Sequence, residues 1–296
     1  MANIVSKKLW FFLISGILVL IAVISLVTFG LKPGIEFSSG SIVTINFEEE
    51  VTQEELEQEL ANLGFGNTLI QHTGSDDFII RTHELTGAAK TSLENALTDT
   101  FGNLRETEFN SVSPMIATET TRNAAIAIAI ASIGILLYVT WAFRRMPKPF
   151  HYGTCAIIAL LHDTIIALGV FSILGGVLGW EINMMFITGI LAVIGYSVNN
   201  TVVVFDRIRE TQERDHNSSF ETIVNRSLVE TFSRSINTSL TTLFVVLALL
   251  FFVGVSIQNF SIVLLIGIIA GTFSSLCIAP LLLVVWEKSS LSRSTE

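Results

Sequence analysis

Charged residues are scarce in this sequence. Asp, Glu, Lys and Arg make up 15% of its 296 residues, whereas a typical soluble domain holds about 25%. The net charge of −9 lacks the basic excess of a nucleic-acid-binding protein, so we expect no nucleic-acid partner. Apolar residues make up 50% of the chain, far more than in a disordered protein. The composition argues against a soluble globular enzyme and predicts an integral membrane protein.

Cysteine and proline are also rare. The two cysteines, Cys155 and Cys277, each lie inside a long apolar run. They offer neither a disulfide framework nor the spacing of metal ligands. The five prolines and twenty glycines exclude collagen-like and linker-type chains. We expect no metal and no cofactor.

Long apolar runs, by contrast, are abundant, and six of them can cross a membrane, since a spanning helix needs about 20 mostly apolar residues. The first run is too long for a signal peptide and no small-x-small cleavage site follows it, so we expect an uncleaved anchor. The predicted spans are residues 9–30, 124–143, 153–174, 183–205, 236–255 and 260–286.

The basic residues predict the side of the membrane on which each loop lies, because short cytoplasmic loops are enriched in Lys and Arg. If the N-terminus is cytoplasmic, cytoplasmic segments hold 12 of the 17 basic residues. We therefore expect both termini inside the cell. The predicted parts are a cytoplasmic N-terminus with the first span (1–30), an extracytoplasmic domain (31–121), a five-helix transmembrane bundle (122–288) and a cytoplasmic tail (289–296).

Residues 31–121 have the pattern of a small α+β domain. Alternating and β-branched residues predict strands at 41–47, 68–72, 77–82 and 105–111, with a turn at Gly74 and Ser75. Thr52 and Glu55 form a capping box that begins one helix, and residues 85–101 form another. The order βαββαβ predicts a ferredoxin-like fold. The expected fold class is therefore a six-helix membrane protein with a ferredoxin-like extracytoplasmic domain.

Polar side chains lie where the spans should face lipid. His162 and Asp163 fall near the middle of the third span, where a charged group costs about 2.5–3.5 kcal/mol. They form either a hydrogen bond between helices or a protonatable site, and the residues alone leave both interpretations open. Ser197, Asn199 and Asn200 lie in a polar band at 195–201 of the fourth span. This band either packs helices together or lines a transport path.

A polar stripe also lies on the fifth span. Residues 234, 237, 238, 241 and 242 share one helical face, and a polar face on an apolar helix turns toward protein or water. Arg234, one turn from Thr238, either extends its charge outward to the interface or faces the Asn199 and Asn200 band. Asp206 ends the fourth span beside other charges, most simply as a solvated helix end.

Five segments together resemble a known family. GIEFSSGS at 34–41 is similar to its G-[LI]-D-F-x-G-G-[TS] motif, and IGYSVNNTVVVFDRIRE at 194–210 to its very specific I-G-Y-S-x-N-D-[TS]-[IV]-V-V-x-D-R-I-R-E signature. Further motifs match ALLHDTIIALG at 159–169, SRSINTSLTTL at 233–243 and IGIIAGTFSS at 266–275. Nearly the whole chain resembles the SecF branch of the SecD/SecF family of bacterial protein-export membrane proteins, which is related to the RND transporter superfamily. The family-signature positions are Gly34, Glu36, Gly40, Asp206 and Arg207.

The resemblance implies a non-enzymatic subunit in the bacterial cytoplasmic (inner) membrane. Its implied partners are SecD and the SecYEG channel, with YajC and YidC as further candidates, and its implied substrate is unfolded polypeptide. The resemblance also implies that the proton-motive force drives outward movement of the polypeptide. Because the chain has six spans rather than twelve, we expect SecD to be a separate chain.

The chain departs from the family pattern at three positions. Glu36 replaces Asp and Ser39 replaces Gly, which are mild changes. Asn200 stands where the family has an intramembrane Asp that is implicated in proton transfer together with the arginine at Arg234. An amide has no titratable proton, so we expect coupling to use Asp163, a carboxylate on SecD, or both. Asn199, Asn200 and Arg234 would then form a largely non-titrating wall of the path.

Two other functional classes compete with protein export. One is an RND-type half-transporter that exports a lipid or small molecule, although such pumps carry a far larger extracytoplasmic region than the roughly 90 residues found here. The other is a membrane enzyme built on the His162 and Asp163 pair, but no third catalytic residue or metal-ligand spacing supports it. The remaining histidines are expected to be ordinary surface residues: His72, His83, His151 and His216.

Overall fold

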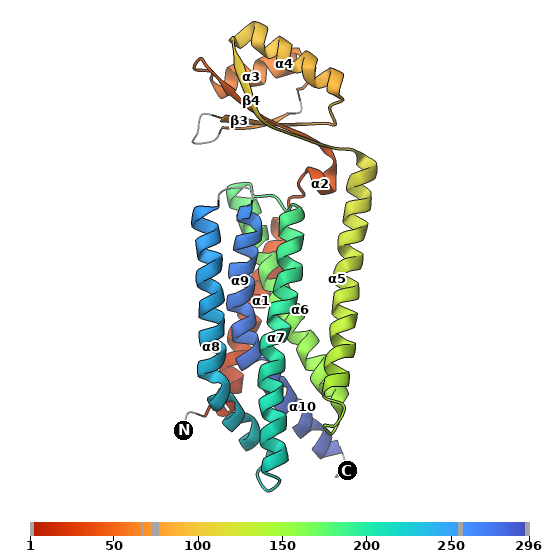
Figure 1. Ribbon diagram of the computed structural model, residues 1–296, viewed down its shortest axis with the longest axis vertical. Helices are drawn as coiled ribbons and strands as arrows, with labels where there is room; N and C mark the ends of the chain where they lie inside the picture. The colour runs from red at the N-terminus through yellow and green to blue at the C-terminus, as the bar shows by residue number, and fades with distance from the viewer. Residues whose placement is uncertain (1–2, 67, 73–76, 254–256, 294–296) are drawn as a thin grey trace. The chain divides into compact units, whose positions relative to one another are not determined.

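The structure is a computed structural model that describes residues 3–66, 68–72, 77–253 and 257–293 (Figure 1). The chain forms two compact units. The first, the helical bundle, combines Met1–Lys32 with Ala125–Glu296, and the second, the sheet domain, is Pro33–Ala124. The predicted turn at Gly74 and Ser75 lies outside the described residues.

Six helical stretches within the described residues are long and apolar enough to cross a membrane, as predicted. A 3-10 turn, η1 (Val5–Lys7), precedes the first. The spanning helices are α1 (Lys8–Thr28), α5 (Pro114–Ala142), α6 (Pro149–Leu178), α7 (Met184–Arg214), α8 (Phe220–Phe252) and α9 (Gln258–Cys277), which α10 (Ala279–Arg293) continues.

The sixth span is broken, whereas the sequence predicts a single run over 260–286. α9 ends at Cys277 and α10 begins at Ala279. Pro280 explains the break, because a proline has no N–H for the carbonyl of Leu276 and its ring clashes with that carbonyl. α10 therefore leaves the axis of α9 (Figure 1).

The bundle is held together by close helix–helix contacts at small residues. A Cβ on Gly267 of α9 would lie 2.1 Å from Val193 Cγ2 of α7, and one on Gly169 of α6 would lie 2.3 Å from Ala22 Cβ of α1. α5 differs, because apolar side chains such as Ile130 stay exposed along it, and it stands at the margin of the bundle (Figure 1). Since helices in lipid gain no hydrophobic energy from meeting each other, close packing of small residues is what joins them.

The sheet domain has the strand and helix order βαββαβ after a short helix α2 (Ile35–Ser38) that the sequence did not predict. Its antiparallel sheet has the order β2-β3-β1-β4, with Val43 opposite Ile80. α3 and α4 lie on the same side of the sheet (Figure 1) and share its core. The elements are β1 (Gly40–Phe47), α3 (Gln53–Asn62), β2 (Leu69–His72), β3 (Asp77–Thr82), α4 (Gly87–Phe101) and β4 (Leu104–Val112).

The helix starts in the sheet domain follow their capping residues. The predicted capping box is present, since the Thr52 hydroxyl accepts from the Glu55 N–H at 3.3 Å and the Thr52 N–H donates to Glu55 Oε2 at 3.0 Å. The second helix begins two residues later than predicted, because Thr86 is its N-cap. Leu85 is instead a buried core residue whose N–H donates to Ser41 Oγ at 2.8 Å.

Candidate functional site

The candidate site is centred on Asp163, which lies midway along α6. Its side chain is fully buried, and among the described residues it is the only acidic side chain that is buried. Its exposed fraction is 0%, so this carboxyl group has no contact with bulk solvent. A buried carboxyl group must find hydrogen-bond partners inside the protein or carry a proton.

Three side chains contact the two oxygens of Asp163. His162 Nδ1 lies 2.9 Å from Oδ1. The hydroxyls of Ser197 on α7 and Ser274 on α9 donate to Oδ2 at 2.5 Å and 2.7 Å. The carboxyl group therefore links three spanning helices, and both of its oxygens have a hydrogen-bond partner.

Gly271 allows α9 to approach the site. A Cβ at this position would lie 3.2 Å from Ser197 Cβ and 3.4 Å from Asp163 Oδ2. Ser274, one turn further along, can reach the carboxyl group only because this contact is so close. Sequence reasoning did not single out Gly271 or Ser274 as site residues, although both fall in the IGIIAGTFSS motif, whose run of small residues was the available signal.

His162 has one ring nitrogen without a partner. The side chain is only 7% exposed, Nδ1 faces Asp163, and Nε2 has no hydrogen-bond partner among the described residues. Leaving a buried donor or acceptor unpaired costs about 1–3 kcal/mol. A group kept at such a cost is a candidate for function rather than packing.

Asn200 belongs to a separate, neutral cluster. Its amide donates to Ser239 Oγ of α8 at 3.4 Å, and Thr272 Oγ1 of α9 donates to the same oxygen at 2.6 Å. Thr201 Oγ1 donates to the Ser197 carbonyl at 3.1 Å, which places the two clusters on adjacent turns of α7. This cluster can join helices but holds no titratable group.

The other predicted path residues are not drawn into either cluster. Asn199, Arg234 and Thr238 are exposed on the surface of the chain, and the Thr238 hydroxyl donates to the Arg234 carbonyl at 2.9 Å. Arg234 lines a cavity of ≈ 290 Å³ together with Asp206 and other charged residues. Arg234 thus lies beside the charged end of α7, and among the described residues no hydrogen bond joins it to Asn199 or Asn200.

The charges at the end of α7 are more than a solvated helix end. Arg207 forms ion pairs with Glu210 and with Glu230 of α8, while Arg209 pairs with Asp206 at 2.6 Å. The pair with Glu230 ties α7 to α8. Because these side chains are partly exposed, each pair contributes little, about 0–1 kcal/mol, so their main effect is to fix the geometry of the helix ends.

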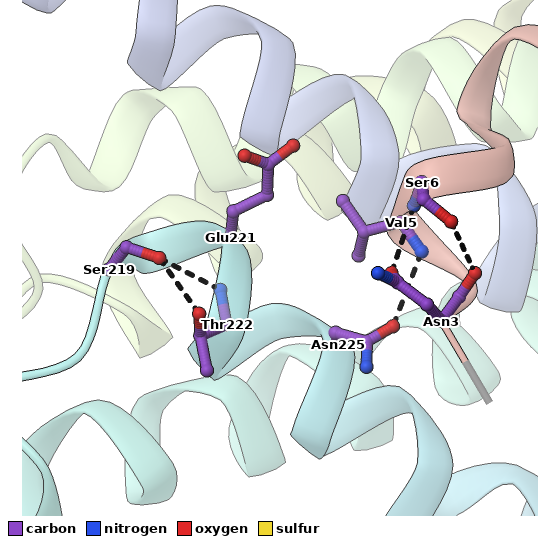
Figure 2. Close-up of a pocket in the computed structure, with 7 residues that line it drawn as sticks. All are labelled: Asn3, Val5, Ser6, Ser219, Glu221, Thr222 and Asn225. Atoms are coloured by element: carbon purple, nitrogen blue, oxygen red, sulfur yellow. Dashed lines mark hydrogen bonds between the residues drawn. The ribbon is translucent and has the colours of Figure 1, made fainter. Parts of the chain in front are cut away.

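A second polar cavity, of ≈ 430 Å³, lies where the N-terminal turn meets the start of α8 (Figure 2). Asn225 Oδ1 accepts from the backbone N–H groups of Ile4 at 2.8 Å and Val5 at 3.3 Å. Glu221 pairs with Lys8 and Lys288 at 2.9 Å and 2.7 Å. These contacts hold the N-terminal turn, α8 and α10 together, and they lie apart from the Asp163 site.

The segment GIEFSSGS forms the entry to β1. Gly34 is the N-cap of α2, and Glu36 lies in its first turn. Gly40 has φ +126°, and a Cβ there would lie 2.6 Å from the Thr82 carbonyl oxygen, so only glycine fits. Ser39 has φ +64° and ψ +165° although it carries a side chain. This strained residue stands where the family motif has its other glycine.

The Asp163 site combines a carboxyl group with an imidazole, and its described residues lack the ligands of a metal centre. Within the described ranges, no group of three or more His, Cys, Asp or Glu side chains could hold a metal ion. Asp163, His162, Ser197 and Ser274 form a connected set of hydrogen-bonding groups. Such a set inside a spanning bundle is typical of a proton relay.

Comparison with known proteins identifies relatives over nearly the whole chain. Residues 92–289 match the family model for the protein export membrane protein SecD/SecF, C-terminal, and residues 24–51 match that for the SecD/SecF GG motif. The protein translocase subunit SecF of Thermobaculum terrenum is 43% identical, over 99% of this chain and 96% of the relative. The fused SecDF of Bacillus subtilis is 35% identical, over 98% of this chain and 39% of the relative.

A solved structure agrees with these sequence matches. The crystal structure of SecDF from Thermus thermophilus, a translocon-associated membrane protein, superposes with a TM-score of 0.84 at 31% identity, covering 97% of this chain and 39% of that one. Six apolar helices and relatives of this kind make the chain a membrane protein of the bacterial cell membrane. The chain belongs to the SecD/SecF family of protein export membrane proteins, in its SecF branch.

Proposed function

We propose that this chain is the SecF-type, non-enzymatic subunit of a Sec protein translocase and assists export of unfolded polypeptides at the expense of the proton-motive force. The carrying observation is the match to the Thermobaculum terrenum SecF over 99% of this chain. The sheet domain is ferredoxin-like on this proposal, which its βαββαβ order and antiparallel β2-β3-β1-β4 sheet support.

The proposed partner is SecD, as a separate chain, and the polar stripe on α8 is its docking face. Arg234, Asn237, Thr238 and Thr241 are exposed on one side of this spanning helix. Polar side chains inside a membrane turn toward protein or water, so a second bundle would cover them. The fused SecDF relatives, in which both proteins form one chain, support this pairing. SecYEG, YajC and YidC are the further proposed partners.

Copurification tests the docking face. Replacing Asn237 and Thr238 together by Leu should lower the yield of SecD recovered with the tagged chain, because the stripe loses its polar groups. Leu240→Ala, on another face of the same helix, is the matched control and should leave the yield unchanged. Equal recovery of SecD with the unsubstituted chain, the Asn237 and Thr238 double variant and the Leu240→Ala variant would contradict this interface.

The proposed topology places both termini in the cytoplasm and the sheet domain outside. A single cysteine at Asn95, exposed on α4, should react with a membrane-impermeant thiol reagent in spheroplasts, and one at Ser218 should not. Both variants are made after replacing the native Cys155 and Cys277 by Ala. The reverse labelling pattern would refute this orientation. It would also refute the proposal that the chain assists export outward from the cytoplasm.

Proton coupling is assigned to Asp163, to a carboxylate on SecD, or to both. Asn200 cannot titrate, and Asp163 on α6 is buried and hydrogen-bonded to α7 and α9. Asp163→Asn keeps the size of the side chain but removes the proton site, so proton-driven export in membrane vesicles with the complex intact should fall sharply. Asp163→Glu is the control that keeps a carboxyl group and should retain part of the activity.

Two results would redirect this assignment. Export at the wild-type rate by Asp163→Asn would make Asp163 structural and leave coupling to SecD. A higher rate with a steeper pH dependence in Asn200→Asp would show that the position of the family aspartate was the missing proton site. ATP-driven export by the same vesicles, measured without a proton gradient, separates loss of coupling from loss of assembly.

A further inference from the structure

The unpaired nitrogen of His162 lies on the opposite side of the imidazole ring from Asp163. Nδ1 is 2.9 Å from Asp163 Oδ1, whereas Nε2 has no partner among the described residues and the side chain is more than nine-tenths buried. Imidazole can gain a proton on one nitrogen and release one from the other. The position of His162 therefore allows a proton to pass through the imidazole to the carboxyl group.

The packing of α1 on α6 indicates which part of α1 lies level with His162. Ser172 Oγ of α6 donates to the Ser25 carbonyl of α1 at 2.7 Å, a pair 147 residues apart. Gly169 and Ala22, in contact at the same interface, are separated by the same number of residues. Constant separation means that the two helices run in the same direction. Two turns earlier, the same offset places the buried Ser15 level with His162.

Aromatic rings close this region from the α9 side. The ring of Phe273 on α9 lies 6.3 Å from that of Phe11 on α1 and 6.4 Å from that of His162, centroid to centroid. α1, α6 and α9 therefore meet at this level. Ser197 and Ser274 approach Asp163 at its other oxygen, Oδ2, so the side of the carboxyl group that faces His162 is separate from the side that the two serines contact.

Among the described residues, the helices α1, α7, α9 and α10 bring no other charged group against the imidazole. α1 has its single charged residue at its first position, Lys8, and α9 has none. The titratable side chains nearest in sequence to the site on α7 and α9 are Tyr196 and Cys277, which are uncharged at neutral pH. α10 meets α6 near Lys148, at the far end of that helix. Asp163 is thus the acidic group that the imidazole contacts.

We propose that His162 is the proton port of Asp163 and that protons reach Nε2 from the side where α1 and α6 pack, at the level of Ser15. A proton binds to Nε2 while the proton on Nδ1 passes to Asp163 Oδ1. The pair then changes from a net charge of −1 to neutral, and release reverses both transfers. This inference rests on the proposed function, since it supplies the entry to the coupling site named there.

Proton uptake into proteoliposomes that contain this chain with its SecD partner tests the port. The initial rate is measured with a pH-sensitive dye under an imposed membrane potential, at several values of external pH. His162→Gln retains an amide that can donate to Asp163 but cannot relay a proton, so uptake should fall by about a hundredfold, the lower end of the contribution of a positioned proton-transfer group. His151→Gln, on the same helix but stacked on Trp286, is the matched control and should match the wild type.

The pH profile distinguishes a relay from a structural role. Without the port, a proton must reach Asp163 directly, so uptake by His162→Gln should become more steeply dependent on pH than in the wild type. A fall by one constant factor at every pH would show that His162 only supports the fold and would overturn the proposal. Ser15→Leu, which touches none of the hydrogen bonds of Asp163, should also slow uptake, and wild-type uptake by this variant would refute entry beside α1.

Asp163→Asn separates this inference from the function on which it rests. Loss of uptake in Asp163→Asn with wild-type uptake in His162→Gln would refute the port and leave Asp163 as the coupling site. Wild-type uptake in Asp163→Asn would show that Asp163 takes no part in coupling. It would also refute the proposed role of His162, because that role depends on Asp163. The infrared band of the protonated Asp163 carboxyl group gives a second readout, because its exchange in heavy water should be slower in His162→Gln than in the wild type.

Discussion

Ser39→Gly should stabilise the sheet domain, although it removes a side chain. Ser39 has φ +64° and ψ +165°, a region that is essentially restricted to glycine and costs other residues of order 1–3 kcal/mol. The side chain is half-buried, and the structure shows no hydrogen bond from its hydroxyl within the described residues. The substitution therefore relieves strain without breaking a side-chain contact.

The expected gain is smaller than the strain itself. Glycine loses about 0.5–1 kcal/mol more conformational freedom on folding than alanine does, so the net stabilisation should be about 1 kcal/mol. That difference lowers the equilibrium population of locally opened molecules about fivefold. For a domain of this size it also raises the midpoint of thermal unfolding by about 4–8 °C.

Hydrogen exchange of the purified full chain measures the effect directly. The amides of β1 and β3 should exchange about fivefold more slowly in Ser39→Gly. Ser38→Gly is the matched control, because Ser38 lies in α2 and its hydroxyl donates to the Gly34 carbonyl at 2.9 Å, so that variant should exchange faster. Unchanged or faster exchange in Ser39→Gly would refute the claim that Ser39 stores strain.

Three further predictions concern packing, capping and pH dependence. Gly267→Ala should destabilise the bundle by about 1–3 kcal/mol, because its Cβ would overlap Val193 on α7. Gly134→Ala is the control and should be neutral, because the space around Gly134 is open. Thermal unfolding in detergent compares the stabilities of the two variants. Thr52→Ala should destabilise the sheet domain by about 1 kcal/mol through loss of the N-cap, as seen by urea unfolding. The hydrogen bond from the Thr52 backbone lowers the pKa of Glu55 in the folded domain. The stability that the capping box contributes is therefore present above the unfolded-state pKa of Glu55 and is lost as the pH falls through its folded-state pKa. A Glu55→Gln variant should lose that pH dependence of stability.

Local patterns in the sequence were enough to predict the spans, the capping box and the polar pair. Apolar runs of spanning length, a Thr followed three residues later by Glu, and an Asp inside a span are each visible within one element. Such features depend on short-range rules, and the structure has all of them. The βαββαβ order of the sheet domain was likewise readable from alternation and turn residues.

The partners of Asp163 could not be predicted because they depend on how helices pack. Ser274 is 111 residues away in sequence, and it reaches the carboxyl group only through the close approach at Gly271. Nothing within α9 distinguishes this serine from its neighbours before the helices are placed. Likewise, a polar stripe indicates that one face of α8 avoids lipid. It does not indicate whether the helix that covers this face belongs to this chain. In the structure Arg234 on that face is exposed.

The break between α9 and α10 changes how much of the sixth hydrophobic run is needed to cross the bilayer. α9 has 20 residues, and at 1.5 Å per residue it is about 30 Å long, which is the thickness of the hydrocarbon core. α9 alone is therefore long enough to cross, and α10 is available to pack against other helices. Its Trp286 stacks on His151 at 4.2 Å and its Glu287 pairs with Lys148 at 3.2 Å. α10 thus joins the end of α9 to the start of α6 through an aromatic stack and an ion pair.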